Sequence, residues 1–218
     1  MATTGANTPR ERYRAQVRAE ITKRAWEQIA TAGASALSLN AIAKQMGLSG
    51  PALYRYFASR DDLITELVRE AYRGLADTLR AAAAAGADLA GLAHALRGWA
   101  LADPQRYFLV YGTPVPGYHA PADITAISSE IMTTLLDACT ALAPADGAPT
   151  PFGAYLAEHR SWAAGHPAPP GALRRFLACW TRLHGVLSLE LAGHFGGMDL
   201  DPALLFAAEL DELLAPRA

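Results

Sequence analysis

The sequence predicts an all-α fold of about nine to ten helices, and three observations support this prediction. Alanine, the strongest helix former, is abundant along the whole chain. Alternating runs of Val, Ile and Thr, which would indicate strands, are missing. Apolar residues recur instead at helical spacing between breaks rich in glycine and proline, such as 112–121 and 144–151. Outside the segment 38–57, the expected helices are Arg10–Ala32, Arg60–Ala85, Asp88–Leu101, Gln105–Tyr111, Ile124–Leu142, Phe152–Ala164, Leu173–Phe195 and Pro202–Leu214.

The bulk composition indicates a folded chain of one large or two modest domains. Of its 218 residues, 51% are hydrophobic and 18% are charged, which excludes a disordered chain. No apolar stretch reaches the roughly 18–20 residues that a membrane helix needs, so no membrane partner is expected. The N-terminus lacks an apolar signal core. Two cysteines, Cys139 and Cys179, form no disulfide framework, which favours buried thiols and a cytoplasmic location.

The segment 38–67 predicts two short helices joined by a tight turn, followed by a long helix. Ser38 is a candidate N-cap for the first helix, and Gly47 stands where a glycine would end it. Ser49 is the candidate N-cap of the second helix, which is expected to continue to Phe57. A short helix, a glycine turn and a second short helix with basic and tyrosyl residues form a helix-turn-helix that fits a DNA major groove.

Charge divides the chain into a basic head and an acidic body. Residues 1–60 contain nine Lys and Arg but three Asp and Glu, a net charge of +6. Residues 61–218 contain ten Lys and Arg and eighteen Asp and Glu, a net charge of −8. The net charge of −2 for the whole chain conceals this asymmetry. A polyanion such as double-stranded DNA would be attracted to the head and repelled by the rest.

The sequence IAKQMGLSGPALYRYFASRDDLI resembles the DNA-binding signature of the TetR family of transcriptional regulators. The matching positions are Ile42, Ala43, Gly47, Leu48, Ser49, Leu53, Tyr54, Tyr56, Phe57 and Arg60. The resemblance implies a DNA-binding domain over residues 1–60 and a regulatory and dimerisation domain over residues 61–218. It also implies a sequence-specific transcriptional regulator, with repression as the expected role. Two heads related by a dimer twofold axis would read an inverted-repeat operator.

The same resemblance assigns roles to residues of the helix-turn-helix. The helix end that approaches base edges comprises Ser49, Gly50, Pro51 and Ala52. Arg55 is the best candidate for a guanine contact, because its fork matches the O6/N7 pair, and Asn40 is the second choice. The expected phosphate contacts are Lys44, Tyr54, Tyr56 and Arg60, with Arg12 and Arg14. Many family members carry a polar side chain where this chain has Gly50 or Ala52, so DNA shape is expected to contribute more to recognition.

A second resemblance concerns the C-terminal part. Trp180, His184 and Gly185 match the W-x3-H-G element of one TetR C-terminal subfamily, and Asp103–Pro121 agrees with that subfamily as well. The resemblance implies a homodimer formed through the last two long helices. Leucines at helical spacing support this, since they make Leu173–Phe195 apolar on many sides.

The resemblance also implies a small-molecule inducer pocket in the C-terminal domain. The candidate lining residues are His94, Trp99, Tyr107, Tyr111, Met132, Tyr155, Trp180 and His184. Aromatic bodies with few polar tips are typical of such pockets and favour an apolar or aromatic ligand. A regulator that binds DNA without any inducer is an open alternative.

Metal and enzyme sites are not indicated. The possible metal ligands Cys139, Cys179, His184 and His194 show no pair at standard spacing. G-x-S-x-G, phosphate-loop and H-E-x-x-H motifs are missing, so neither a cofactor nor catalysis is expected. A helical enzyme that uses His94 or His184 is the alternative from another class, and it would leave the basic head unexplained.

Overall fold

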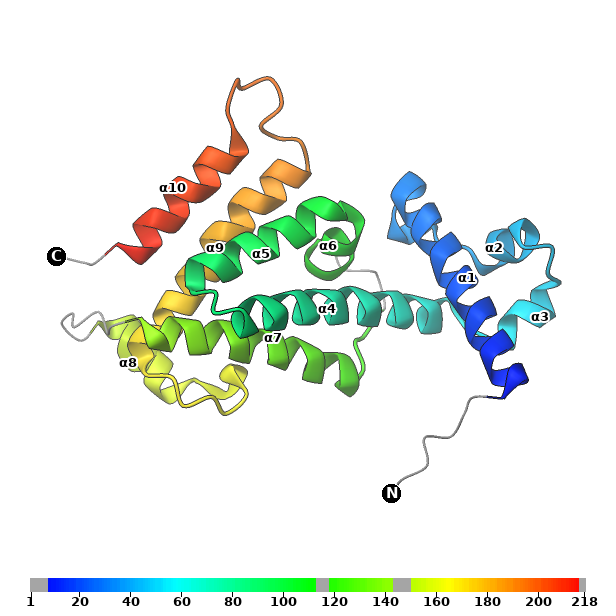
Figure 1. Ribbon diagram of the computed structural model, residues 1–218, viewed down its shortest axis with the longest axis horizontal. Helices are drawn as coiled ribbons and strands as arrows, with labels where there is room; N and C mark the ends of the chain where they lie inside the picture. Colours follow the sequence, from blue (N-terminus) through cyan, green and yellow to red (C-terminus); the bar gives the residue numbers. More distant parts are fainter. Residues whose placement is uncertain (1–7, 113–117, 143–149, 216–218) are drawn as a thin grey trace. The chain divides into compact units, whose positions relative to one another are not determined.

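The computed structural model describes residues 8–112, 118–142 and 150–215, which contain ten α-helices and no strand (Figure 1). The all-α prediction is confirmed. The helices are α1 (Pro9–Ala32), α2 (Leu39–Gln45), α3 (Gly50–Tyr54), α4 (Arg60–Ala84), α5 (Leu89–Ala102), α6 (Pro104–Tyr111), α7 (Ala122–Ala141), α8 (Pro151–Glu158), α9 (Pro170–Leu191) and α10 (Pro202–Leu214). Two short 3-10 helices are Ala34–Ala36 and Ser161–Ala163. Within the described ranges, no helix is both long and apolar enough to cross a bilayer.

The chain divides into two compact units. The first unit comprises residues up to Ala71 together with Gln105–Pro121, and the second comprises Tyr72–Pro104 and the residues from Ala122 onward. This grouping differs from the expected boundary at residue 60. The reason is that the first turns of α4 contribute core residues, Leu63 and Leu67, which are fully buried.

Capping residues set the limits of α1. The Thr8 side chain accepts the backbone N–H of Glu11, and the Glu11 carboxylate accepts the Thr8 N–H at 2.7 Å, which completes a capping box. At the other end, Gly33 has a φ of +77° and stops the helix. Between these caps, the apolar stripe of Ile21, Ala25 and Ile29 is buried as its spacing predicts.

The turn chemistry predicted for the helix-turn-helix is confirmed. The Ser38 Oγ accepts the N–H of Ala41 at the start of α2, and the Ser49 Oγ accepts the N–H of Ala52 at the start of α3. Between the two helices, Gly47 has a φ of +65°, a conformation that favours glycine. Hydroxyl caps and one left-handed glycine therefore fix both ends of the turn.

Helix α3 is shorter than the sequence suggested. It ends at Tyr54, because the N–H of Tyr56 bonds the Leu53 carbonyl in a tighter three-residue turn. Phe57 lies outside the helix but still fills the core, with 2% of its surface exposed. The Ser59 Oγ then accepts the Asp62 N–H and caps α4, which begins at the next residue.

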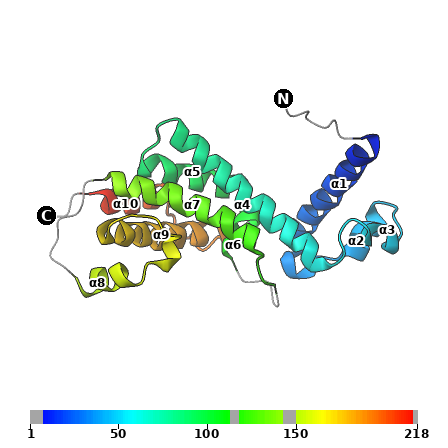
Figure 2. The same ribbon diagram turned by 90° about the horizontal axis from the view of Figure 1, so that it is seen from below.

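Helix α9 is the centre of the second unit. It packs against α5, α7, α8 and α10 (Figures 1 and 2). Its buried residues lie on several faces, so it needs neighbours on several sides. These residues are Ala172, Leu173, Phe176, Cys179, Leu183, Val186 and Leu187.

Two boundaries in this unit differ from the expectation. Helix α8 ends at Glu158 rather than Ala164, because His159 caps it and the chain then forms a 3-10 turn and a left-handed residue at Ala164. Helix α9 begins at Pro170, since proline suits a first turn, and it ends at Leu191, before Gly193 with a φ of +77°. The expected loops 112–121 and 144–151 lie largely outside the described residues.

A nearly buried ion pair joins α5 to α9. The Arg97 guanidinium donates to both carboxylate oxygens of Glu190, at 2.5 and 3.2 Å. The Arg97 and Glu190 side chains are 17% and 13% exposed, respectively. The two parallel hydrogen bonds satisfy both charged groups. Removal of either side chain would leave the other charge nearly buried without a counter-charge.

We expect Arg97→Ala to lower the free energy of unfolding by about 3 kcal/mol, because it leaves the Glu190 charge buried without its partner. Urea unfolding at neutral pH measures the loss. Arg80→Ala is the matched control, since the Arg80–Asp77 pair is 64% and 50% exposed and should contribute little. Equal losses for the two substitutions would contradict the claim that burial makes the Arg97–Glu190 pair more important for stability than the exposed pair.

His184 is a half-buried histidine on α9. Its burial lowers the pKa of the imidazole to about 4, against an ordinary value of 6.5. The imidazole is therefore neutral in the folded chain at physiological pH. The unfolded chain takes up this proton first as pH falls, so protonation of His184 favours unfolding.

Because the folded-state pKa is depressed, we expect stability from His184 that is present above about pH 6.5 and is lost as pH falls toward 4. The loss over this range is on the order of 3 kcal/mol. Urea unfolding of the wild type and of His184→Phe at pH 7.5, 6 and 4.5 measures the contribution of His184 to the pH dependence of the free energy of unfolding. Equal pH slopes for the two proteins would show that His184 is not the cause.

Candidate nucleic-acid interface and ligand cavity

Helix α3 presents a polar and basic face outward from a firmly anchored base. Its Leu53 is fully buried, and α3 packs against α2. Pro51, Tyr54 and Arg55 are exposed, with 45% of Tyr54 accessible. Gly50, Ala52 and Tyr56 are half-buried, and Ser49 is exposed but uses its hydroxyl as the N-cap. This face offers Arg55 and Tyr54 to a partner, as expected for a recognition helix.

An open groove of about 420 Å³ lies beside α3. Its lining residues are Leu37, Ser38, Leu39, Asn40, Tyr54, Ala58, Ser59 and Arg60. Asn40 also faces α3, because a Cβ placed on Gly50 would lie 3.7 Å from the Asn40 Oδ1. The structure thus brings Asn40, Gly50 and Tyr54 to one side of the unit. Alanine at Gly50 would make only ordinary van der Waals contact there.

Arg60 has a structural role that differs from the expected phosphate contact. Its guanidinium donates to the carbonyls of Ala34 at 2.8 Å, Leu37 at 3.1 Å and Ser35 at 3.2 Å. These bonds satisfy the carbonyls around the first 3-10 helix and fix the entry to α2. Arg60 is therefore already engaged within the chain.

Arginines of α1 support the end of α3. Arg18 donates to the Tyr56 carbonyl at 2.6 Å and to the Glu66 carboxylate at 3.2 Å, and its guanidinium lies 4.2 Å from the Phe57 ring centre. Arg14 reaches the Arg55 carbonyl at 3.5 Å. The sequence analysis did not identify the role of Arg18. The only local signal is that it lies one helical turn after Arg14.

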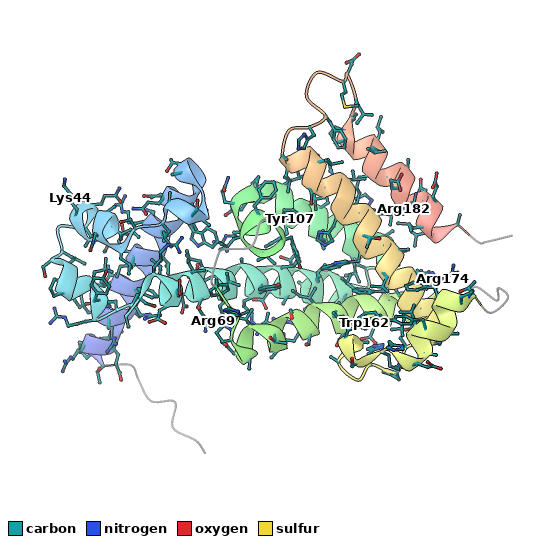
Figure 3. The ribbon with its side chains drawn as sticks, turned by 180° about the vertical axis from the view of Figure 1, so that it is seen from behind. Lys44, Arg69, Tyr107, Trp162, Arg174 and Arg182 are labelled. Carbon is teal, nitrogen blue, oxygen red and sulfur yellow. The ribbon has the colours of Figure 1, made fainter. Side chains whose placement is uncertain are left out.

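The remaining predicted cations of this interface are accessible. Lys44, in the last turn of α2, is exposed, and Figure 3 shows its side chain pointing away from the helices. Arg12 and Arg55 are exposed as well. From residue 28 to residue 60 the sequence contains no Asp or Glu. The potential over α2 and α3 therefore favours a polyanion.

A tryptophan joins three helices of the first unit. Trp26 of α1 donates its indole N–H to Glu70 of α4 at 3.0 Å, and the Arg106 guanidinium of α6 lies 5.1 Å from its ring centre. Helix α6 adds a second aromatic group, in which the Tyr107 and Tyr111 rings lie 5.4 Å apart. Helix α6 thus belongs to the first unit, although it follows α5 in the chain.

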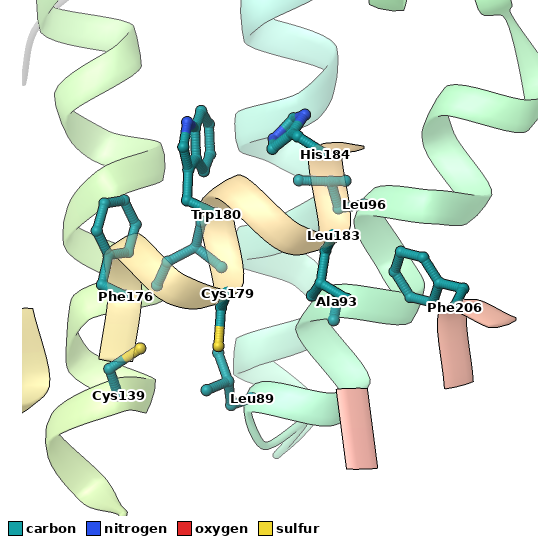
Figure 4. Close-up of a pocket in the computed structure, with 11 residues that line it drawn as sticks. Leu89, Ala93, Leu96, Cys139, Phe176, Cys179, Trp180, Leu183, His184 and Phe206 are labelled. Atoms are coloured by element: carbon teal, nitrogen blue, oxygen red, sulfur yellow. The ribbon is translucent and has the colours of Figure 1, made fainter. Parts of the chain in front are cut away.

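The second unit contains a small, partly open apolar cavity of about 30 Å³ (Figure 4). Its lining residues are Leu89, Ala93 and Leu96 of α5, Leu135 and Cys139 of α7, Phe176, Cys179, Trp180, Leu183 and His184 of α9, and Phe206 of α10. Of the predicted ligand residues, Trp180 and His184 line it. The W-x3-H-G spacing places both on one face of α9.

The other six predicted ligand residues do not line this cavity. Tyr107 and Tyr111 belong to the first unit. Tyr155 is 53% exposed and stacks on His159 at 4.1 Å. His94 is exposed, and Trp99 and Met132 are half-buried on other helix faces. Residue type alone does not reveal which face of a helix turns inward, whereas the helical spacing of Leu89, Ala93 and Leu96 would have indicated one wall.

The cavity wall is uncharged at neutral pH. Burial raises the pKa of the Cys139 thiol to about 12, and the nearby Cys179 contributes to this shift. The His184 imidazole is neutral for the reason given above. Among residues 8–112, 118–142 and 150–215, no three His, Cys, Asp or Glu side chains gather where they could hold a metal ion.

Comparison with known proteins assigns both parts of the chain. Residues 21–67 match the family "bacterial regulatory proteins, tetR family", and residues 89–213 match "tetracyclin repressor-like, C-terminal domain". The HTH-type transcriptional regulator Rv1816 of Mycobacterium tuberculosis is 36% identical over 217 residues, which cover 93% of this chain and 92% of that protein.

Solved structures agree with this assignment. The crystal structure of SCO4313, described as a regulatory protein, is 71% identical with a TM-score of 0.87, over 96% of this chain and 100% of that one. A Rhodococcus protein, 22% identical with a TM-score of 0.68 over 98% and 97% of the two chains, shares the fold. With a basic helix-turn-helix and a helical C-terminal domain, the chain belongs to the TetR family of DNA-binding transcriptional regulators.

Proposed function

We propose that this chain is a homodimeric repressor that binds an inverted-repeat operator and releases it when a small, uncharged ligand enters the α5–α7–α9–α10 cavity. The observation that carries the proposal is the exposed face of α3 with Arg55 at its C-terminal end, held on a buried Leu53 anchor. DNA as the partner supports a cytoplasmic location, and membership of a regulator family supports a role without catalysis.

The proposed readout follows from the exposed side chains. Arg55 contacts a guanine edge through its fork, and Asn40 contacts a second base beside Gly50. Lys44 and Tyr54 bind phosphates and set the register. The further proposed contacts are Ser49, Pro51, Ala52, Tyr56, Arg12 and Arg14. Arg60 contributes indirectly, because it holds the entry to α2.

The outer surface of α9 and α10 supports the proposed dimer. Figure 1 shows these helices side by side. On α9, Gly185 and Leu189 are exposed, and on α10, Ala208 and Leu204 are exposed, Leu204 to 69%. Small residues beside leucines allow helices of two subunits to approach closely. A twofold axis along this surface would present two copies of α3 to one palindrome.

Covalent and packing contacts support the proposed release. Helix α5 forms one wall of the cavity and is followed after Asp103 by α6. Arg106 of α6 lies on Trp26 of α1, the helix that holds the end of α3, and in the proposal a displacement of α5 reaches α1 through this covalent connection. A ligand that favours the displaced form would shift the population away from DNA binding. Trp180 and His184 of the W-x3-H-G element line the cavity. This supports the proposal that the chain belongs to the W-x3-H-G subfamily and that a ligand binds in this cavity.

A regulator without an inducer is the second candidate, and the small cavity volume of about 30 Å³ favours it. The two functions differ in one measurable property, the change in operator affinity when a ligand is added.

Selection from a random DNA pool with the purified full chain, at near-physiological salt, is expected to enrich an inverted repeat. Leu204→Asp provides the control, because Leu204 is exposed and its substitution should weaken the dimer without disturbing the monomer fold. This variant should retain folding by circular dichroism and lose the preference for the repeat. If a folded, dimeric wild type enriches no sequence, the operator-binding proposal fails.

We expect Arg55→Ala to weaken operator binding by about 1–3 kcal/mol and to flatten the sequence preference, because a base contact is lost. Lys44→Ala should weaken operator and random DNA alike and reduce the salt dependence. Fluorescence anisotropy with both DNAs over a salt series separates the two effects. Equal losses of Arg55→Ala on operator and random DNA would remove Arg55 from the base-reading set.

A further inference from the structure

The cavity of the second unit excludes charged ligands by its composition. Of its eleven lining side chains, none carries a charge at neutral pH (Figure 4). The lining residues that carry polar atoms are Cys139, Cys179, Trp180 and the neutral His184, while the surface that they turn to the cavity in the described form is apolar. A carboxylate or an ammonium group that enters such a wall loses its hydration and gains no counter-charge.

The cation beside this wall is already neutralised. Arg97 follows Leu96 on α5, and its guanidinium lies 5.6 Å from the ring centre of Phe206. Both of its contacts to Glu190 are hydrogen bonds, at 2.5 and 3.2 Å. An anionic ligand would have to break this pair to recruit Arg97. The arrangement therefore disfavours anions as well as cations.

Three rings of α9 form a continuous aromatic wall. Phe176, Trp180 and His184 follow one another at four-residue spacing. The first two ring centres lie 5.7 Å apart at 25°, and the last two lie 4.2 Å apart at 53°. Figure 4 shows these side chains rising from one helix. Offset and tilted rings attract a further flat ring, and the imidazole can form one hydrogen bond.

We propose that this cavity binds an uncharged molecule with an aromatic ring and one hydrogen-bonding group, the ring against Trp180 and the polar group at His184. The inference rests on the proposed inducible function and names the class of its ligand.

The cavity is small in the described structure. Its volume of about 30 Å³ is far below the roughly 150 Å³ of an apolar cavity that accepts benzene. Binding therefore requires outward movement of lining side chains. A variant that enlarges the cavity beforehand removes part of this requirement and binds more tightly. Leu183, whose side chain lines the cavity on α9, is the position for such a change.

The test uses the purified full chain without DNA and four probes of similar size, namely phenol, toluene, benzoate and benzylamine. Thermal shift and calorimetry at pH 7 measure binding. Phenol and toluene are expected to stabilise the protein, phenol with roughly three- to tenfold higher affinity because of its hydrogen bond. Benzoate and benzylamine are expected to give no shift at the same concentration.

Two substitutions probe the wall directly. His184→Phe keeps the ring but removes the hydrogen-bonding atoms, so phenol and toluene should bind equally. His194→Phe is the matched control, because His194 is exposed beyond the end of α9, and it should keep the wild-type preference. Leu183→Ala should bind both neutral probes more tightly. Cys179→Ala is the smaller enlargement if Leu183→Ala does not fold.

Either of two results would overturn the inference. One is that benzoate or benzylamine stabilises the wild type as strongly as toluene. The other is that no neutral ring stabilises either the wild type or a folded enlarged variant. Operator release is measured separately by anisotropy. Neutral rings that bind without releasing DNA support the inference and contradict the proposed induction. Release of DNA by benzoate would contradict the inference about the ligand class and would support the proposed induction.

Discussion

The arrangement of the second unit is determined by helix α9, which has apolar residues on several faces that must be buried. Its buried residues, from Leu173 to Leu187, lie on more than one face, so α5, α7, α8 and α10 all pack against it. The strip that stays exposed contains Thr181, Gly185 and Leu189, which are small or apolar. One helix thus supplies the core, the aromatic wall of the cavity and part of the proposed dimer surface. A change in its register would alter all three together.

In the first unit, the arginines divide into two groups that net charge alone does not distinguish. Arg18 and Arg60 donate to backbone carbonyls at the end of α3 and before α2. Arg55 and Lys44 are exposed on the outer face. The basic head therefore combines cations that hold the recognition helix in place with cations that are available to DNA. In the proposed interface, loss of a cation from either group would weaken DNA binding, but only loss from the exposed group would change direct contacts with DNA.

Local chemistry explains which parts of the structure the sequence could predict. The caps Ser38 and Ser49 and the turn at Gly47 depend on nearby atoms, so they could be identified from a short segment. The end of α8 at Glu158, with His159 as its C-cap, could not be predicted in this way, because no glycine or proline marks that position in the sequence. The cavity brings together four helices distant in sequence, and residue type selected Tyr107 and Tyr155 as readily as Trp180 and His184. Only packing decides which of these rings face one another.

The small cavity is compatible with an inducible regulator. A ligand shifts an equilibrium only by the difference in its affinity for the two states. The described cavity, at about 30 Å³, is too small for a ring, so under the proposal a ring-sized ligand would bind only an expanded form. Its selectivity between the states is therefore large, while its apparent affinity is reduced by the rarity of the expanded form. In the proposed release, expansion would move α5, which continues through Asp103 into α6, where Arg106 lies on Trp26. Under the proposed induction, a tightly packed cavity would therefore make the response to a ligand sharper and its apparent affinity lower.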